Sequence, residues 1–158
     1  MDTDLLRPAV SFIAFVLLVA VVALSGVYFQ PGEWYAALAK PAWTPPNWLF
    51  PVAWTLLYLS IAISGWLVWR MVAVRPTALA FSLYGLQLVL NAAWSWLFFG
   101  LHRMDLAFMN IVALWVAILA TIIAFCQIRP AAGLLLIPYL LWVGFAAALN
   151  LAIWRLNA

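Results

Sequence analysis

The chain has 158 residues, a length that fits one domain. Hydrophobic residues make up 70% of it and charged residues only 7%, whereas globular domains average about 45–50% apolar and about 25% charged residues. A water-soluble fold would lack the polar residues to cover its surface, so an ordinary soluble enzyme is excluded. The net charge of +3 comes from basic residues scattered singly along the chain, and this scatter excludes the basic stripe that binds nucleic acid.

Five long charge-free segments divide the chain, and each has at least 23 residues. A helix needs about 20 apolar residues to cross a bilayer. We therefore predict an all-α integral membrane protein, with 1–158 as a single domain that forms a five transmembrane helix bundle. The predicted spans are 8–29, 47–70, 76–100, 105–128 and 130–154.

Very short links between the later spans force consecutive helices to lie antiparallel in one bundle. Pro8, Pro76 and Pro130 each precede or open an apolar run and predict helix starts, because a first-turn residue needs no N–H. Pro51 and Pro138 fall inside predicted spans, where we expect kinks. An odd number of spans places the termini on opposite sides of the membrane. Four basic residues on one side against three on the other predict no orientation.

The link 30–46 is much longer than the others and is rich in proline and tryptophan. Long loops in a compact fold are usually functional lids or mobile segments. We interpret 30–46 as a functional lid or a mobile segment, on the same side of the membrane as the C-terminus.

The charged residues offer little catalytic chemistry. Arg103 and Asp105 predict an interfacial ion pair, and His102 has no cluster of ligands around it, so no metal site is predicted. A Ser-His-Asp set is missing from the sequence. No cofactor is required, and redox or photochemistry would have to reside on a bound group.

Amide side chains inside the spans are the clearest polar signal. Gln87, Asn91 and Trp94 lie at i, i+4 and i+7 and therefore share one helix face, and Asn150 is a second buried amide in the last span. Such groups should point inward, away from lipid. Two interpretations stay open: hydrogen bonds between helices, or polar anchors in an apolar aromatic pocket.

Eleven tryptophans need an explanation. Those near span ends fit an interfacial belt, but Trp54, Trp94, Trp115 and Trp142 lie deeper, where an indole N–H must find a partner. Flat aromatic walls suit a flat polycyclic ligand such as a tetrapyrrole or a sterol, and a packed aromatic core is the alternative. Pairs of small residues four apart explain either helix packing within the bundle or a homodimer: Ser60 and Ser64, Ala78 and Ser82, Gly144 and Ala148.

Three motifs of this sequence resemble the TspO/MBR family of tryptophan-rich sensory proteins, translocator proteins and peripheral-type benzodiazepine receptors. The first is the run Lys40-Pro41-Ala42-Trp43-Thr44-Pro45-Pro46-Asn47-Trp48 followed by Pro51, Trp54 and Tyr58. The second runs from Gln87 to Trp94 and on to Gly100, and the third from Pro138 through Trp142 and Asn150 to Asn157.

The resemblance implies a pocket between the helices that binds porphyrins and, in many members, sterols and benzodiazepine-type ligands. It also implies Trp54 and Trp142 as aromatic walls and Asn91 and Gln87 as polar contacts. The further lining residues that it implies are Tyr35, Trp94, Ala146 and Leu149.

By resemblance we expect a membrane tetrapyrrole-binding protein that acts as a sensor or carrier in porphyrin handling and stress. One alternative is light- and oxygen-dependent porphyrin degradation, with Trp54 and Trp142 as the catalytic residues, and another is a structural protein that modulates partners. Leu151 stands where the family's sterol motif has an aromatic residue, which argues against sterol binding through it. The chain also ends at Ala158 without the basic tail of animal members. We therefore expect a bacterial cell membrane, with the outer membrane as an alternative.

Overall fold

The computed structural model describes residues 3–158, in which there are helices and no strand. Five helical segments of this range are long and apolar enough to cross a membrane, as predicted. The helices, in chain order, are α1 Thr3–Tyr28, α2 Glu33–Ala37, α3 Leu49–Trp69, α4 Ala78–Ser95, the π-helical η1 Trp96–Gly100, α5 Met104–Ile128, α6 Pro130–Leu134 and α7 Ile137–Leu156.

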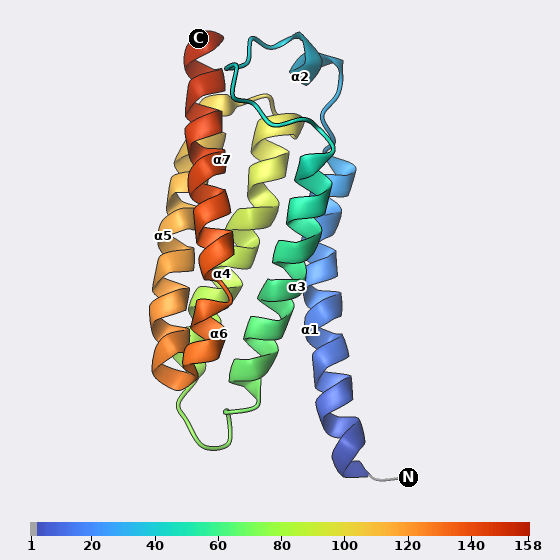
Figure 1. The fold of residues 1–158 in the computed structure, drawn as a ribbon, viewed down its shortest axis with the longest axis vertical. Coiled ribbons are helices and arrows are strands. Elements are labelled where there is room, and N and C mark those ends of the chain that lie inside the picture. Colours follow the sequence, from blue (N-terminus) through green and yellow to red (C-terminus); the bar gives the residue numbers. More distant parts are fainter. Residues whose placement is uncertain (1–2) are drawn as a thin grey trace.

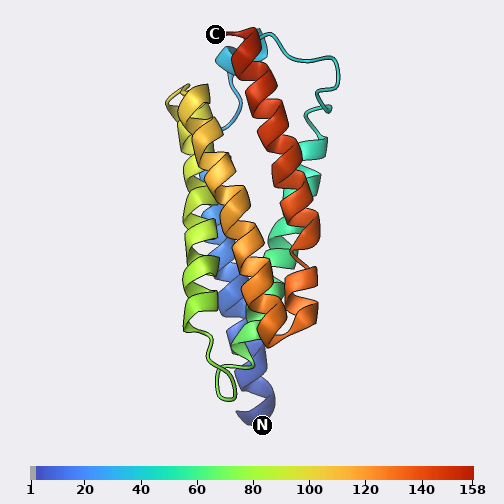
Figure 2. The same cartoon turned by 90° about the vertical axis from the view of Figure 1, so that its left-hand side faces the viewer.

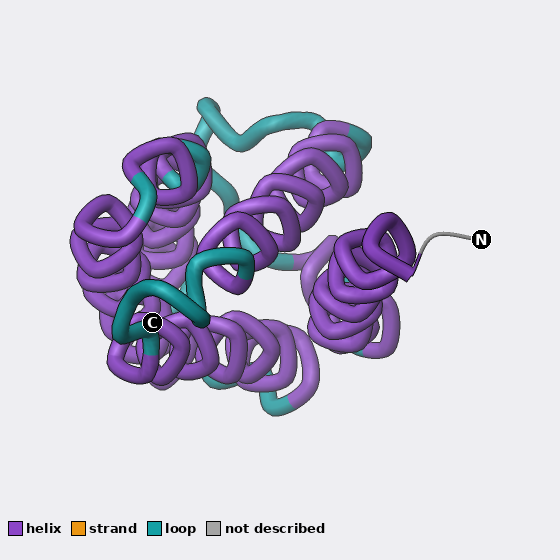
Figure 3. The backbone as a smooth tube through the Cα atoms, turned by 90° about the horizontal axis from the view of Figure 1, so that it is seen from below, coloured by secondary structure: helices purple, strands orange, loops and turns teal. Residues whose placement is uncertain are grey.

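The long helices run up and down in one bundle (Figure 1). α4 packs along α5, α5 packs along α7, and α1 lies against α3 and α4. Viewed along the bundle, α1 lies at its edge (Figure 3). The N- and C-terminal ends lie at opposite ends of the bundle, and the 30–46 segment with α2 lies at the C-terminal end, as predicted (Figures 1 and 2).

Two of the three predicted helix starts need correction. α1 begins at Thr3, so that Pro8 lies inside the helix instead of opening it. The apolar pattern marks where the hydrocarbon begins, whereas a helix continues beyond it into the polar layer. α4 begins at Ala78 after an N-cap at Thr77, two residues past Pro76. Pro130 is the first residue of α6, which confirms the third start.

The fifth span is broken into α6 and α7 by a turn at Leu135 and Leu136 (Figure 2). A proline ring clashes with the carbonyl four residues earlier and supplies no N–H. Pro138 has Leu134, the last residue of α6, at that position, so the expected kink takes the form of a break. No kink forms at Pro51, because this residue lies in the first turn of the continuous helix α3.

Small residues of α3 hold the broken span against the bundle. The Ser60 hydroxyl donates to the Leu135 carbonyl at the break, and Ser64 Oγ donates to the Ala132 carbonyl over 2.7 Å. Both carbonyls belong to the α6 region, where hydrocarbon offers no other donor. This pair of small residues thus serves packing within the bundle, and the homodimer stays a prediction.

The outer surface of the bundle is apolar, as a lipid-facing surface must be. α1 is the least buried span, and large aliphatic side chains along it are more than half exposed, among them Val10, Ile13, Leu17, Val21 and Leu24. Monomeric soluble proteins rarely expose a continuous row of aliphatic side chains like this one, whereas a helix that faces lipid does. The structure is therefore that of a multi-pass membrane protein.

We predict that Ser64→Ala destabilises the fold by about 1 kcal/mol, because it removes a fully buried hydrogen bond between α3 and α6. The measurement is the midpoint of unfolding in detergent. Ser82→Ala is the matched control, since the Ser82 hydroxyl is exposed and donates only within its own helix, to Ala78. Equal midpoints for the two variants would contradict the role of Ser64.

Candidate ligand-binding site

Six aromatic side chains line the facing sides of α3 and α7. On α3 they are spaced four residues apart, which places them on one face of the helix. On α7 they are spaced three apart, which again keeps neighbours on one side. We call this set the aromatic seam, and its members are Phe50, Trp54 and Tyr58 of α3 and Tyr139, Trp142 and Phe145 of α7.

Edge-to-face contacts join the two sides of the seam. The ring centroids of Phe50 and Trp142 lie 5.9 Å apart, and those of Trp54 and Tyr139 lie 6.2 Å apart. The α3 and α7 backbones themselves approach each other at few points. The two helices, which run antiparallel (Figure 1), are therefore bridged by large side chains, and Trp54 and Trp142 stay only half-buried.

A chain of hydrogen bonds connects the seam to α4. Tyr58 Oη donates to Asn91 Oδ1 over 2.9 Å, Asn91 Nδ2 donates to Tyr139 Oη over 2.9 Å, and Tyr139 Oη donates to Gln87 Oε1 over 3.0 Å. We call these four residues the polar relay. The amide of Asn91 therefore pairs with tyrosines of two other helices, as the interhelical interpretation requires.

Two N–H donors beside this relay have no partner. Within the described residues, Gln87 Nε2 and Trp142 Nε1 are the buried side-chain polar atoms that lack a hydrogen bond. An unsatisfied buried donor costs about 1–3 kcal/mol, and hydrocarbon supplies no water to satisfy it. Both donors are thus suited to meet an acceptor on a bound molecule.

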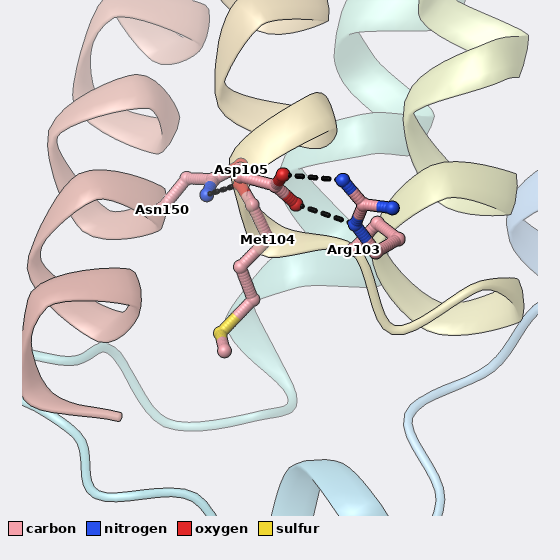
Figure 4. Close-up of polar contacts among 4 residues, drawn as sticks. All are labelled: Arg103, Met104, Asp105 and Asn150. Atoms are coloured by element: carbon pink, nitrogen blue, oxygen red, sulfur yellow. Dashed lines mark hydrogen bonds and ion pairs between the residues drawn. The ribbon is translucent and has the colours of Figure 1, made fainter. Parts of the chain in front are cut away.

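A second buried amide ties the ends of three helices together. Trp94 Nε1 donates to Asn150 Oδ1 over 3.1 Å, and Asn150 Nδ2 donates to the Met104 carbonyl over 3.0 Å at the start of α5 (Figure 4). Beside them Arg103 pairs with Asp105, with 2.6 Å between Nη2 and Oδ2, which confirms the predicted ion pair. The N–H of the Trp94 indole is therefore already paired, and its ring stacks on Phe98 with 5.1 Å between the ring centroids.

The 30–46 segment packs over this end of the bundle. Tyr35 of α2 is buried against Phe98 and Phe99, at 6.2 and 5.5 Å between ring centroids. Burial raises the pKa of the Tyr35 phenol above its ordinary value. Trp34 stacks on His102 with 4.1 Å between the rings. The segment is thus an ordered cover with aromatic contacts of its own.

The predicted site residues fall into two adjoining groups. Trp54, Trp142, Asn91 and Gln87 belong to the seam and the polar relay. Ala146 packs against the same core cluster as Trp54 and Trp142. The other predicted residues pack in or against the cluster under the 30–46 segment: Tyr35, Trp94 and Leu149.

Four residues of this site were not among the predicted contacts: Phe50, Tyr58, Tyr139 and Phe145. The spacing of Phe50, Trp54 and Tyr58 is a sequence signal for one aromatic face. Nothing in the sequence indicates that Tyr58 and Tyr139 are the partners of the α4 amides, because this pairing depends on how three helices pack.

A hollow of about 270 Å³ lies between α5 and α7 and is lined by Val112, Trp115, Gly144 and Ala147. None of the predicted ligand contacts lines it. Trp115 lies over Gly144, where an added Cβ would come within 3.2 Å of the indole nitrogen. In the described part of the chain, no group of three or more His, Cys, Asp or Glu side chains is placed to hold a metal ion.

The fold defines a multi-pass helical membrane protein, and aromatic and amide side chains of α3, α4 and α7 meet between its helices. The TspO/MBR family model matches residues 12–155. The chain belongs to the TspO/MBR family, as the sequence motifs predicted.

Similar proteins carry the names of this family. Protein CrtK of Rhodobacter capsulatus is 40% identical over 147 residues, which cover 92% of each chain. The tryptophan-rich sensory protein of Cereibacter sphaeroides is 37% identical over 92% of this chain and 90% of its own. The human translocator protein is 36% identical over 95% of this chain and 92% of its own. The family and these names support a role as a membrane sensor or translocator.

We predict that Tyr139→Phe destabilises the protein by about 1–3 kcal/mol, because it leaves the buried Asn91 and Gln87 amides short of a partner. Thermal unfolding in detergent is the measurement. Tyr28→Phe is the control, since Tyr28 is 82% exposed. If Tyr139→Phe melts together with this control, the polar relay does not hold the helices.

Proposed function

We propose that the protein binds tetrapyrroles of the protoporphyrin type at the aromatic seam and acts as a sensor or carrier of them in the membrane. The observation that carries the proposal is the pair of buried, unpartnered donors, Gln87 Nε2 and Trp142 Nε1, next to the seam. A site that served packing alone would gain nothing from leaving two N–H groups unsatisfied in hydrocarbon.

The chemistry of a porphyrin fits this arrangement. Its flat ring system is suited to stack on Trp54 and Trp142, and each aromatic contact contributes about 0.5–1.5 kcal/mol beyond the buried area. Its carboxylates and its two unprotonated ring nitrogens are acceptors suited to the Gln87 and Trp142 donors. No cofactor is needed, because binding uses only side chains of this chain.

The polar relay gives Asn91 a role that differs from the direct contact predicted for it. Its amide oxygen and one N–H are already paired with Tyr58 and Tyr139. We therefore assign Asn91 to positioning the seam tyrosines, and Gln87 to direct contact. In this proposal Ala146 adds to the lining beside Trp54 and Trp142, and Tyr35, Trp94 and Leu149 add to it near the 30–46 segment.

The half-buried state of Trp54 and Trp142 suggests how a ligand arrives. Both indoles lie where α3 and α7 are bridged only by side chains. The outer surface of the helix bundle there faces the lipid of the bilayer. A flat apolar molecule dissolved in the bilayer therefore comes close to the seam without crossing water, and it enters the seam at the end that the 30–46 segment covers. We propose a bacterial cell membrane as the location.

The test is a titration of the reconstituted protein with protoporphyrin IX, followed by quenching of tryptophan fluorescence. We expect saturable quenching, and we expect Trp142→Phe to weaken binding by about 1 kcal/mol, because it keeps an aromatic ring but removes the N–H donor. Trp48→Phe is the control, since Trp48 is 65% exposed and lies outside the seam.

The outcomes separate the hypotheses. Quenching that does not saturate would mean that the aromatic residues only pack, and the proposed function would be wrong. Saturable quenching with equal affinity in Trp142→Phe and Trp48→Phe would keep the binding site but remove the Trp142 donor from it.

A further inference from the structure

One side chain at the end of α7 forms two hydrogen bonds with the backbone of the 30–46 segment. Asn157, the residue that follows α7, accepts a hydrogen bond from the Ala39 N–H at Oδ1 and donates from Nδ2 to the Ala39 carbonyl, each over 2.9 Å. Both backbone groups of one residue are thus paired by one amide, 118 positions away in the chain.

The Asn157 amide is itself held in place. Its Nδ2 also donates to the Ile153 carbonyl over 2.7 Å, in the last turn of α7. The grip on Ala39 is therefore oriented by the helix. In the described part of the chain, the other hydrogen bonds made by the 30–46 segment are local, such as those from Lys40 Nζ to the Ala36 and Leu38 carbonyls.

The two bonds to Ala39 are exposed to solvent. A hydrogen bond in contact with water exchanges readily for bonds to water, and its net contribution is small. The attachment is thus suited to repeated opening, unlike the buried relay of the seam.

Aromatic contacts connect the same segment to the proposed ligand site. Trp43 meets Phe145 with 5.7 Å between ring centroids, and Phe145 meets Trp142 with 5.6 Å between them. A displacement of the segment moves Trp43 away from Phe145 and so changes the packing around Trp142, one of the two unpartnered donors.

We propose that Asn157 is a latch: a positioning residue that holds the 30–46 segment over the end of the seam without touching the ligand, and whose release sets the rate of ligand exchange. The proposal rests on the proposed function for the identity of the ligand. It assigns the opening step to one side chain. It also predicts that this side chain changes the association and dissociation rates but not the affinity.

The first experiment measures the latch without any ligand. Hydrogen–deuterium exchange of the full chain in nanodiscs is compared for the wild type, Asn157→Leu and Asn47→Leu. We expect Asn157→Leu to raise the exchange rate of amides in 38–40 by about tenfold, because two hydrogen bonds are lost. Asn47→Leu is the matched control, since Asn47 is exposed, borders the same segment and makes no side-chain hydrogen bond within the described residues.

The second experiment measures protoporphyrin IX binding by stopped-flow quenching. If the latch gates the site, Asn157→Leu raises the association and dissociation rates by the same factor and leaves the affinity within about twofold, because opening precedes entry and exit alike. A residue with a merely structural role would lower the affinity and would leave the two rates uncoupled.

A second variant removes one of the two hydrogen bonds from the other side of the contact. Ala39→Pro has no N–H to donate, and the extended backbone of the preceding Leu38, with φ −66° and ψ 142°, is compatible with a following proline. We expect it to raise the exchange rates of the amides of residues 38 and 40 and both binding rates, by less than Asn157→Leu does, because the carbonyl of residue 39 keeps its bond. The double variant should add little to Asn157→Leu, since both changes break one contact.

The latch is wrong if exchange of 38–40 in Asn157→Leu equals that of Asn47→Leu, or if exchange rises while both binding rates stay unchanged. If protoporphyrin IX does not bind the wild type, the proposed function fails and with it the gating of this ligand. The exchange measurement then still decides whether Asn157 holds the segment, so the two failures are distinguishable.

Discussion

The hydrogen bonds that Asn91 and Tyr139 share across three helices are the constraint on which the rest of the structure depends. A bilayer core contains no water, so an amide or a phenol inside it must find its partner in the protein. Because those partners come from α3, α4 and α7, these helices are held in one relative position. These bonds keep α3 and α7 close enough for the aromatic side chains of the seam to fill the space between the two helices.

Because polar groups in the bilayer core need partners within the protein, the few that have no partner are informative. Ser60, Ser64, Trp94 and Asn150 all find acceptors or donors in neighbouring elements. The Gln87 Nε2 and Trp142 Nε1 donors differ from these groups because they have no hydrogen-bond partner. Gln87 is hydrogen-bonded to Tyr139 of the seam, and Trp142 is itself a seam residue, so the proposed site combines ring faces for stacking with free donors.

Different interactions stabilise the two ends of the proposed site: buried hydrogen bonds at one end, and exposed hydrogen bonds with aromatic contacts at the other. In the bilayer core, the relay is buried and its bonds are stable because nothing competes for them. At the membrane surface, the 30–46 segment is attached by exposed bonds and by aromatic contacts such as Trp34 on His102. The protein thus combines a rigid floor with a cover whose attachments compete with water.

The sequence by itself determined the number of spans, their approximate limits and the side on which the long link lies, because hydrocarbon tolerates only long apolar helices. It also identified Gln87, Asn91 and Asn150 as inward-facing amides, since a polar group facing lipid is costly. Helix ends were less predictable: α1 extends to Thr3, and the fifth span breaks at Leu135 and Leu136, just ahead of Pro138. Only the tertiary structure decided that Asn91 pairs with Tyr58 and Tyr139, that Gln87 keeps a free donor, and that Asn157 reaches Ala39. Those pairings join residues far apart in the chain, and their geometry follows from helix packing and not from local spacing.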